Sequence, residues 1–298
     1  EKHHHEYSAS AKSSRFPHGL CDMSKEESKR DVELSPEDRT AHEVADLWRA
    51  APGQEADAAV IWLHHQGESE AMQQMMFGDV QIPSAGRVRW LWPRAPLQPS
   101  SIRGHSLVLQ WFDVKEYPIC RKVRGVPDRP RRDEDPEDVQ KAVQRLEAVV
   151  KALEVEGLPR ERIVVGGFGM GGALALKTVL QSRNAFAGGV FCSAWLPCQE
   201  ELDERLREGG ITTELLWCHG ARDGVVEPSL AAEQAKMLKE LGVQLRFQLY
   251  PEMQFELSAE PLAAVQRFIQ KCLEPPPLTV EDPTPEVEQF GENLEMSH

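Results

Sequence analysis

Residues 166–176, GGFGMGGALAL, follow the apolar run Ile163–Val165 and have the composition of a tight turn that opens a helix. In a nucleophile elbow, written G-x-S-x-G, a strand, a sharp turn and a helix expose a serine hydroxyl for covalent acyl transfer. The corresponding residues here are Gly167-Phe168-Gly169-Met170-Gly171, so glycine stands where the serine is expected. The segment therefore has the setting of a nucleophile without the nucleophile.

The same segment also satisfies G-x-G-x-x-G through Gly167, Gly169 and Gly172, which is the pattern of a dinucleotide-binding turn. Backbone N–H groups at the start of such a helix can hold a pyrophosphate. However, the next apolar run, 188–193, does not end in the acidic residue that binds a ribose, and at least two apolar runs precede the motif. Nucleotide binding is therefore the weaker interpretation.

Other groups that can move or orient a proton follow further apolar runs. Asp223 lies just after the run 214–220, where a carboxylate can orient a catalytic base. For the nearby His219 we expect a hydrogen-bonded structural role, and His64 and His65 are the remaining candidates for a base. The six cysteines form no C-x-x-C pair, and residues with metal-ligand spacing are absent from the folded region, so we expect neither a disulfide framework nor a metal site.

Short apolar runs alternate with amphipathic segments along the chain. A long amphipathic helix is expected to start at Asp135-Pro136, and others follow Gly169, cover about 229–241 and carry Leu262 to Leu273. Alternation of strand and helix predicts a doubly wound, mostly parallel sheet flanked by helices. The expected strands are 58–63, 87–92, 163–168, 188–193, 214–220 and 244–250, with a further apolar stretch at 106–112.

The charge balance excludes some classes of partner. The 298 residues carry a formal net charge of −14, which disfavours binding to nucleic acid phosphates. No stretch reaches the roughly 18 apolar residues of a membrane helix. The scattered cysteines and the lack of an apolar signal segment at the start predict a reducing, cytoplasmic location.

Composition divides the chain into four parts. We expect a disordered extension over 1–34, an N-terminal helix within 35–56, one folded domain over 57–274 and an acidic, proline-rich tail over 275–298. Within the domain, the segment 121–138 changes from basic to acidic. We interpret it as a solvated loop with local charge pairing, and the alternative is a docking loop for an acidic partner.

Six stretches resemble the acyl-protein thioesterase family, the phospholipase/carboxylesterase branch of the α/β-hydrolases. They occur in the order of the family across residues 57–274. The resemblance implies an α/β-hydrolase fold and a Ser/Asp/His triad that cleaves acyl esters and thioesters, including palmitoyl groups on proteins, without a cofactor. The stretches are AAVIWLHHQGE, QWFD, RIVVGGFGMGGALAL, AGGVFCSAWLP, LLWCHGARDGVVEP and LYPEM.

Carried over residue by residue, the resemblance leaves one triad member. The acid corresponds to Asp223 and is retained, whereas the nucleophile position is Gly169. The family's base lies in Y-x-G-M-x-H, which here reads Tyr250-Pro251-Glu252-Met253-Gln254-Phe255, so the base position is Phe255. Glycine offers no nucleophile and phenylalanine accepts no proton, so this triad is incomplete.

The resemblance also assigns the surroundings of the triad. The family's oxyanion loop, H-G-L-G-D, reads His64-His65-Gln66-Gly67-Glu68 here. The backbone N–H groups of Gln66 and Met170 are expected to face an oxyanion, because backbone donors do not depend on the side chain. Trp111 and Trp195 are candidates for an acyl pocket, with burial in the core as the alternative.

Three hypotheses about function remain open. The first is a catalytically impaired member of the family that binds an acyl chain or a lipidated protein, or serves as an interaction scaffold. The second is an active ester or thioester hydrolase with a non-standard site. The third and weakest is a nucleotide binder that uses Gly167, Gly169 and Gly172.

Overall fold

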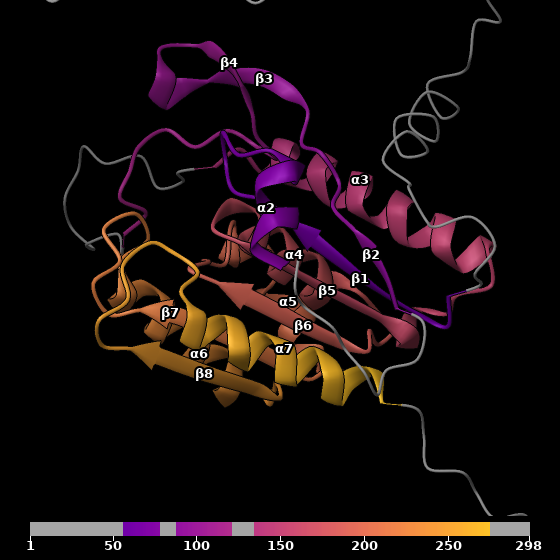
Figure 1. Ribbon diagram of the computed structural model, residues 1–298. Coiled ribbons are helices and arrows are strands. Elements are labelled where there is room, and N and C mark those ends of the chain that lie inside the picture. The colour runs from indigo at the N-terminus through magenta and orange to yellow at the C-terminus, as the bar shows by residue number, and fades with distance from the viewer. Residues whose placement is uncertain (1–55, 78–87, 121–133, 275–298) are drawn as a thin grey trace, which may run out of the picture. The chain divides into compact units, whose positions relative to one another are not determined.

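The computed structural model describes residues 56–77, 88–120 and 134–274 (Figure 1). Three predicted parts therefore lie outside the described residues: the extension 1–34, the helix within 35–56 apart from residue 56, and the tail 275–298. The basic part of the segment 121–138 does so as well. The candidate site residues all lie within the described ranges.

The described domain is built on a parallel sheet of six strands, which confirms the predicted architecture. The strand order is β2-β1-β5-β6-β7-β8, and every neighbouring pair is parallel. The strands are β1 (Ala58–Leu63), β2 (Val88–Leu91), β5 (Ile163–Phe168), β6 (Gly188–Cys192), β7 (Leu215–Gly220) and β8 (Leu245–Tyr250). Strands β1, β5, β6 and β7 are buried along their whole length, as expected for a sheet covered on both faces.

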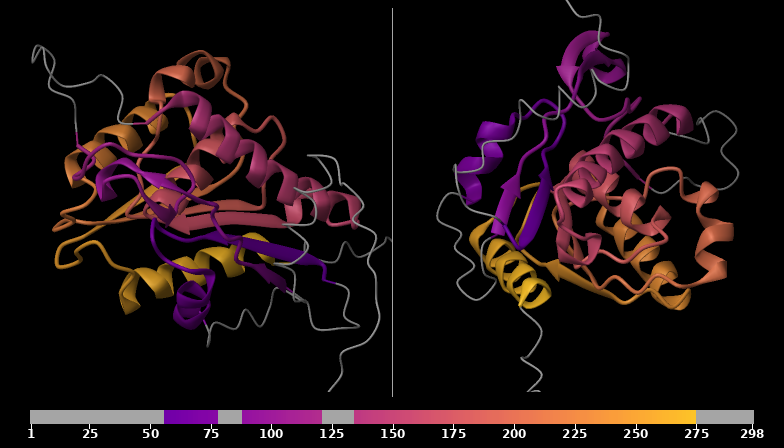
Figure 2. Two further views of the ribbon diagram at one scale, coloured as in Figure 1. Left: turned by 90° about the horizontal axis from the view of Figure 1, so that it is seen from above. Right: turned by 90° about the vertical axis from the view of Figure 1, so that its right-hand side faces the viewer.

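Helices cover both faces of this sheet (Figure 2). Helices α3, α4 and α6 contribute buried residues to one hydrophobic cluster, and α7 contributes to a second cluster on the opposite face. Helix α2 joins the second cluster through Phe77. The helices are α2 (Glu70–Phe77), α3 (Pro136–Val155), α4 (Met170–Gln181), α5 (Asp203–Glu208), α6 (Pro228–Glu240) and α7 (Ala259–Leu273).

Helix α3 begins where the sequence predicts. The Asp135 carboxylate accepts a hydrogen bond from the Glu137 backbone N–H, and Pro136 occupies the first turn, where its missing N–H costs nothing. The predicted apolar stripe of α3 is buried against the sheet: Val139, Val143, Leu146, Val149 and Leu153. The cap and the stripe together fix the start and the rotation of the helix.

Helix α4 packs closely against the sheet. All its residues from Met170 to Leu180 are buried. A Cβ atom at Gly171 would lie closer than 3.0 Å to the Leu63 carbonyl oxygen, and one at Gly172 would lie 2.8 Å from the Gly167 oxygen. Close approach of helix to strand therefore explains these glycines without a bound phosphate.

The apolar stretch 106–112 does not continue the main sheet. Strand β4 (Ser106–Leu109) pairs with β3 (Leu97–Ser100) in a separate antiparallel hairpin, and the chain then returns to the core at Trp111. Leu97 and Leu107 are 59% and 65% exposed, so this hairpin buries little of its apolar surface. The sequence predicted only an apolar stretch here, and an apolar run does not show whether it pairs or with which strand.

Candidate active site

The sheet topology brings two loops together at the carboxyl ends of β1 and β5. The chain leaves β1 through α2 on one face and leaves β5 through α4 on the other face. In open α/β sheets, ligand sites form where neighbouring strands lead to opposite faces in this way. His65 follows β1 and Gly169 follows β5, so both lie at this switch point.

The sharp turn of a nucleophile elbow is present at Gly169. Its φ of 55° and ψ of −120° lie in a region that residues with side chains rarely adopt. Its N–H donates to the Cys192 carbonyl oxygen at 2.9 Å, and its own carbonyl accepts from the Ala173 N–H at 2.9 Å. The turn is thus fixed by the strand beside it and by the helix that it opens.

The side chain of His65 lies over this turn. A Cβ atom built on Gly169 would come closer than 3.0 Å to the Nδ1 atom of His65 and to the Cζ atom of Phe255. Real Cβ atoms essentially never approach other atoms so closely. The space into which a side chain at residue 169 would extend is therefore filled by two rings.

The His65 ring also takes a hydrogen bond at the start of α4. The Met170 N–H donates to His65 Nδ1 at 3.1 Å, so Nδ1 carries no proton and the neutral ring is protonated on Nε2. Burial, with a smaller contribution from the neighbouring His64, lowers the pKa of His65 to about 3. The ring is consequently neutral at physiological pH.

The main chain of His65 is held from both sides. Its N–H donates to Glu68 Oε2 at 3.0 Å, and its carbonyl oxygen lies 2.7 Å from His64 Nδ1. Gln73 of α2 donates to the same Glu68 oxygen at 2.6 Å and accepts from Trp62 Nε1 at 2.9 Å. Burial raises the pKa of Glu68. The hydrogen bonds that Glu68 accepts from the His65 N–H and the Gln73 side chain partly oppose that effect. The loop carrying His65 is therefore anchored to both β1 and α2.

Aromatic rings surround the His65 imidazole, and one of them belongs to Phe255, the residue at the family's base position. Phe255 meets His65 edge-on with the ring centroids 4.8 Å apart, and it packs on Phe168 at 4.6 Å. Phe168 and Tyr117 each lie 6.2 Å from the His65 ring. Edge-on and tilted pairs at such distances are favourable aromatic contacts. The base position is thus part of a packed ring cluster.

The acid position has a different environment. The Asp223 side chain is fully buried, and its Oδ1 accepts from the backbone N–H groups of Val225 and Val226 at 2.9 and 2.8 Å. Its Oδ2 has no hydrogen-bond partner among the described residues. One carboxylate oxygen therefore shapes the loop, and the other is left unpaired.

His219 lies beside this unpaired oxygen. Its Nε2 is 3.4 Å from Asp223 Oδ2 and 3.1 Å from the Val226 carbonyl oxygen, to which it donates in the neutral state. Burial lowers the pKa of His219, while that hydrogen bond and the charge of Asp223 oppose the change. The ring is buried and bonded to its own loop, in agreement with the structural role expected for it.

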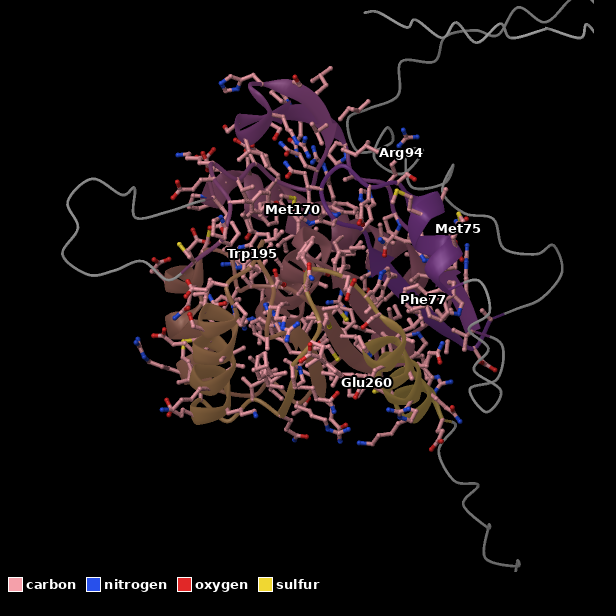
Figure 3. All side chains as sticks on the ribbon, turned by 60° about the vertical axis from the view of Figure 1, so that its left-hand side comes forward. Met75, Phe77, Arg94, Met170, Trp195 and Glu260 are labelled. Carbon is pink, nitrogen blue, oxygen red and sulfur yellow. The ribbon has the colours of Figure 1, made fainter. Side chains whose placement is uncertain are left out.

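The remaining candidates lie around the same loops. The Gln66 side chain donates to Ser100 Oγ at 3.0 Å and to Gln110 Oε1, and so ties the oxyanion loop to the base of the hairpin. The buried Trp111 donates to the His64 carbonyl oxygen, and the buried Trp195 donates to Glu134 Oε1 at 2.6 Å. Met170 and Trp195 can be located in Figure 3. Both indoles belong to the core, and their role in an acyl pocket stays a prediction.

Sequence reasoning did not find the position of His65 over Gly169. The available signal was a pair of changes relative to the resembling family: a histidine replaces the glycine of H-G-L-G-D, and a glycine replaces the serine of the elbow. One position gained a ring and the other lost its side chain. Only the fold shows that the two positions are neighbours.

Two classes of site are not found in the part of the chain that the structure describes. There, His, Cys, Asp and Glu side chains form no group of three or more that could hold a metal ion. Within the same ranges, none of the helices combines the length and the apolar composition needed to cross a bilayer.

Comparison with known proteins gives one consistent result. A family model described as phospholipase/carboxylesterase matches residues 49–273. A probable carboxylesterase of Oryza sativa subsp. japonica is 31% identical over 214 residues, covering 72% of this chain and 77% of that protein. A second protein of the same rice, called a probable inactive carboxylesterase, is 27% identical over 215 residues, covering 72% of this chain and 84% of its own length. The crystal structure of Arabidopsis thaliana SOBER1 is similar with a TM-score of 0.63 at 27% identity, covering 72% of this chain and 99% of that one.

Proposed function

This chain belongs to the phospholipase/carboxylesterase family of α/β-hydrolase fold, and we propose that it is a member that binds an acylated ligand without hydrolysing it. The observation that carries this proposal is the ring packing over the elbow. His65 and Phe255 fill the space that a nucleophile at residue 169 would need. With the two rings in these positions, a side chain at residue 169 does not fit beside them.

Three groups that acyl transfer needs are affected: the nucleophile, the base and one oxyanion donor. The positions of nucleophile and base hold Gly169 and Phe255, and removing such a catalytic unit typically costs about a million-fold in turnover. The Met170 N–H, which would stabilise the developing oxyanion, is engaged by His65. Loss of one oxyanion donor typically costs about a hundred- to a thousand-fold more. Together these losses remove any useful rate.

An active enzyme with a non-standard nucleophile is the rival proposal. The best candidate hydroxyl next to the elbow is Ser193, which directly follows the residue that bonds to Gly169. Its hydroxyl is buried, and it has no hydrogen-bond partner among the described residues. A serine nucleophile needs a base within hydrogen-bond reach. This geometry therefore favours the inactive interpretation.

The binding part of the proposal rests on family membership. Relatives of this fold are named carboxylesterases, so the ligand class that we propose is an acyl ester, a thioester or a lipidated protein. Trp111 and Trp195 remain the proposed acyl-pocket residues. Cys192 and Cys218 are buried thiols that form no disulfide, which supports the proposal of a reducing, cytoplasmic compartment.

Purified protein tests both parts of this proposal. We expect no labelling by a fluorophosphonate probe, no turnover of a long-chain acyl thioester, and saturable binding of a fluorescent fatty acyl ligand. Stoichiometric labelling, or turnover that a single point mutation abolishes, would overturn the inactive assignment. Absence of a saturable signal would remove the binding role.

A restoration series sharpens the test. The double variant Gly169→Ser/Phe255→His returns the two triad members but keeps the His65 ring. The triple variant adds His65→Gly, which frees the Met170 N–H. We expect the triple variant to react with the probe at least about a hundred times faster than the double variant, because an oxyanion donor is worth about that much. Equal rates would show that His65 does not block the site.

A further inference from the structure

We propose that His65 is an internal ligand of this site, which holds the place of a carbonyl or carboxylate oxygen on the Met170 N–H and must leave before such a group can bind there. The proposal rests on the proposed function, because it concerns the same loops at the ends of β1 and β5 and the same class of ligand. It adds a specific displaceable group and a competition that can be measured.

The first argument is the hydrogen bond itself. The Met170 N–H is the first backbone donor of α4 and lies 3.1 Å from His65 Nδ1. The N-terminus of a helix favours an electron-rich acceptor, because its N–H groups lack partners inside the helix. The imidazole nitrogen meets this requirement as an ester oxygen would. One N–H cannot serve both acceptors well, so ring and ligand compete.

The second argument is the freedom of the ring compared with its backbone. Glu68 and His64 bond to the N–H and the carbonyl of His65, so the loop is fixed at this residue. Among the described residues, the ring is held by the bond to Met170 and by aromatic contacts with Phe255, Phe168 and Tyr117. The side chain is half-buried. Rotation about its side-chain bonds therefore releases the N–H without unfolding the loop.

The third argument concerns which ligand can displace the ring. Because the imidazole stays neutral, its bond to Met170 joins two uncharged groups. A hydrogen bond from a backbone N–H to a carboxylate is roughly twice as strong as one between neutral partners. A fatty acid carboxylate is consequently a better competitor than an ester of the same chain. The chemical class that the geometry indicates is therefore an acyl chain ending in a carboxylate.

Two matched variants test the competition. His65→Ala removes the internal ligand, and Phe255→Ala removes a ring from the same cluster but keeps the bond between His65 and Met170. The probes are octanoate and free imidazole, followed by calorimetry and by the amide resonance of Met170. We expect His65→Ala to bind octanoate at least about ten-fold more tightly than the unchanged protein, and to bind imidazole in the vacated space. We expect no such gain for Phe255→Ala.

Several outcomes would overturn the proposal. They are equal octanoate affinity of His65→Ala and the unchanged protein, an equal gain in Phe255→Ala, or imidazole binding to His65→Ala that leaves the Met170 amide unshifted. If His65→Ala does not fold, the unchanged protein is titrated with octanoate while the His65 ring nitrogens are observed. The ring and the Met170 amide are expected to shift together, and octanoate binding that moves neither contradicts the proposal. Thioester turnover would defeat the proposed function instead, and the separate hydrolysis assay detects it.

Discussion

The elbow and the acid loop have opposite structures. At the elbow, the rings of His65 and Phe255 pack over Gly169, and His65 accepts the Met170 N–H. At the acid loop, Asp223 Oδ1 accepts two backbone hydrogen bonds, whereas the buried Oδ2 has no hydrogen-bond partner among the described residues and lies 3.4 Å from His219 Nε2. Ring packing thus dominates the first region, and polar contacts with the main chain dominate the second.

The difference shows that a residue type found in a catalytic triad can have a structural role of its own. Asp223 Oδ1 binds two backbone N–H groups and so closes the turn that leads to α6. Serine and histidine at the other two positions would have no comparable duty towards the main chain. The presence of Asp223 is therefore explained by the fold, and it does not by itself indicate activity.

The largest expected effect comes from removing the two hydrogen bonds that Asp223 Oδ1 accepts from the main chain. Asp223→Ala leaves the half-buried Val225 N–H and the buried Val226 N–H without this acceptor, and an unsatisfied buried group costs about 1–3 kcal/mol. With the lost packing, we expect the free energy of unfolding to fall by about 4 kcal/mol. Denaturant unfolding measures it. Asp223→Asn is the matched control, because it keeps one oxygen acceptor and should lose less than half as much. Equal losses of stability in both variants would indicate that Asp223 stabilises the fold through its charge instead.

A smaller loss is expected when a side chain is added at the elbow. Gly169→Ser places a Cβ at a φ of 55° and against two rings, so we expect destabilisation by about 2–4 kcal/mol from strain and overpacking. In a His65→Ala background, the part of this stability loss that comes from overpacking should decline. A double-mutant cycle should therefore give a coupling free energy of about 1 kcal/mol or more between the two substitutions. Thermal and denaturant unfolding provide the values. A Gly169→Ser protein more stable than its parent would contradict the described packing.

The effect that is smallest near neutral pH, and that grows on acidification, is a pH dependence that distinguishes the packed imidazole of His65 from an exposed one. The pKa of His65 is about 3 in the folded state and about 6.5 when the chain is unfolded, so acidification protonates the unfolded state first. Stability should decrease as the pH falls from about 6.5 towards 3, by at most about 1.4 kcal/mol per pH unit for this group. Stability curves of the unchanged protein and of His65→Gln should therefore diverge below pH 6.5. Identical slopes, or titration of the His65 ring between pH 5 and 8, would count against burial of a neutral ring.

The strands and the main helices could be predicted because each carries a local signal. The apolar runs at 58–63 and 163–168 match β1 and β5, and Asp135 followed by Pro136 marks the start of α3. Helix α2 carries no comparable signal, and it was not predicted. The hairpin β3–β4 was missed because an apolar run indicates burial or pairing but not the partner strand.

The candidate site was predictable only in part. Resemblance to the family located Gly169, Asp223 and Phe255, since each lies in a motif of recognisable spacing. It could not reveal that His65 reaches the Met170 N–H, because that contact joins residues 105 positions apart and depends on one side-chain rotamer. Contacts of this kind arise from packing at the end of the sheet, and packing is not encoded in spacing.

The burial of α4 on every side has a consequence for interpreting similar sequences. From Met170 to Leu180 nearly any enlargement of a side chain meets backbone or core, including at Gly171 and Gly172. Lys177, inside this core, must send its ammonium group to the Cys198 carbonyl oxygen at 2.9 Å. Close packing alone therefore makes most substitutions in this segment destabilising. A close match to it in another chain therefore indicates shared architecture, whereas catalysis depends on the separate residues at the elbow, the base position and the acid loop.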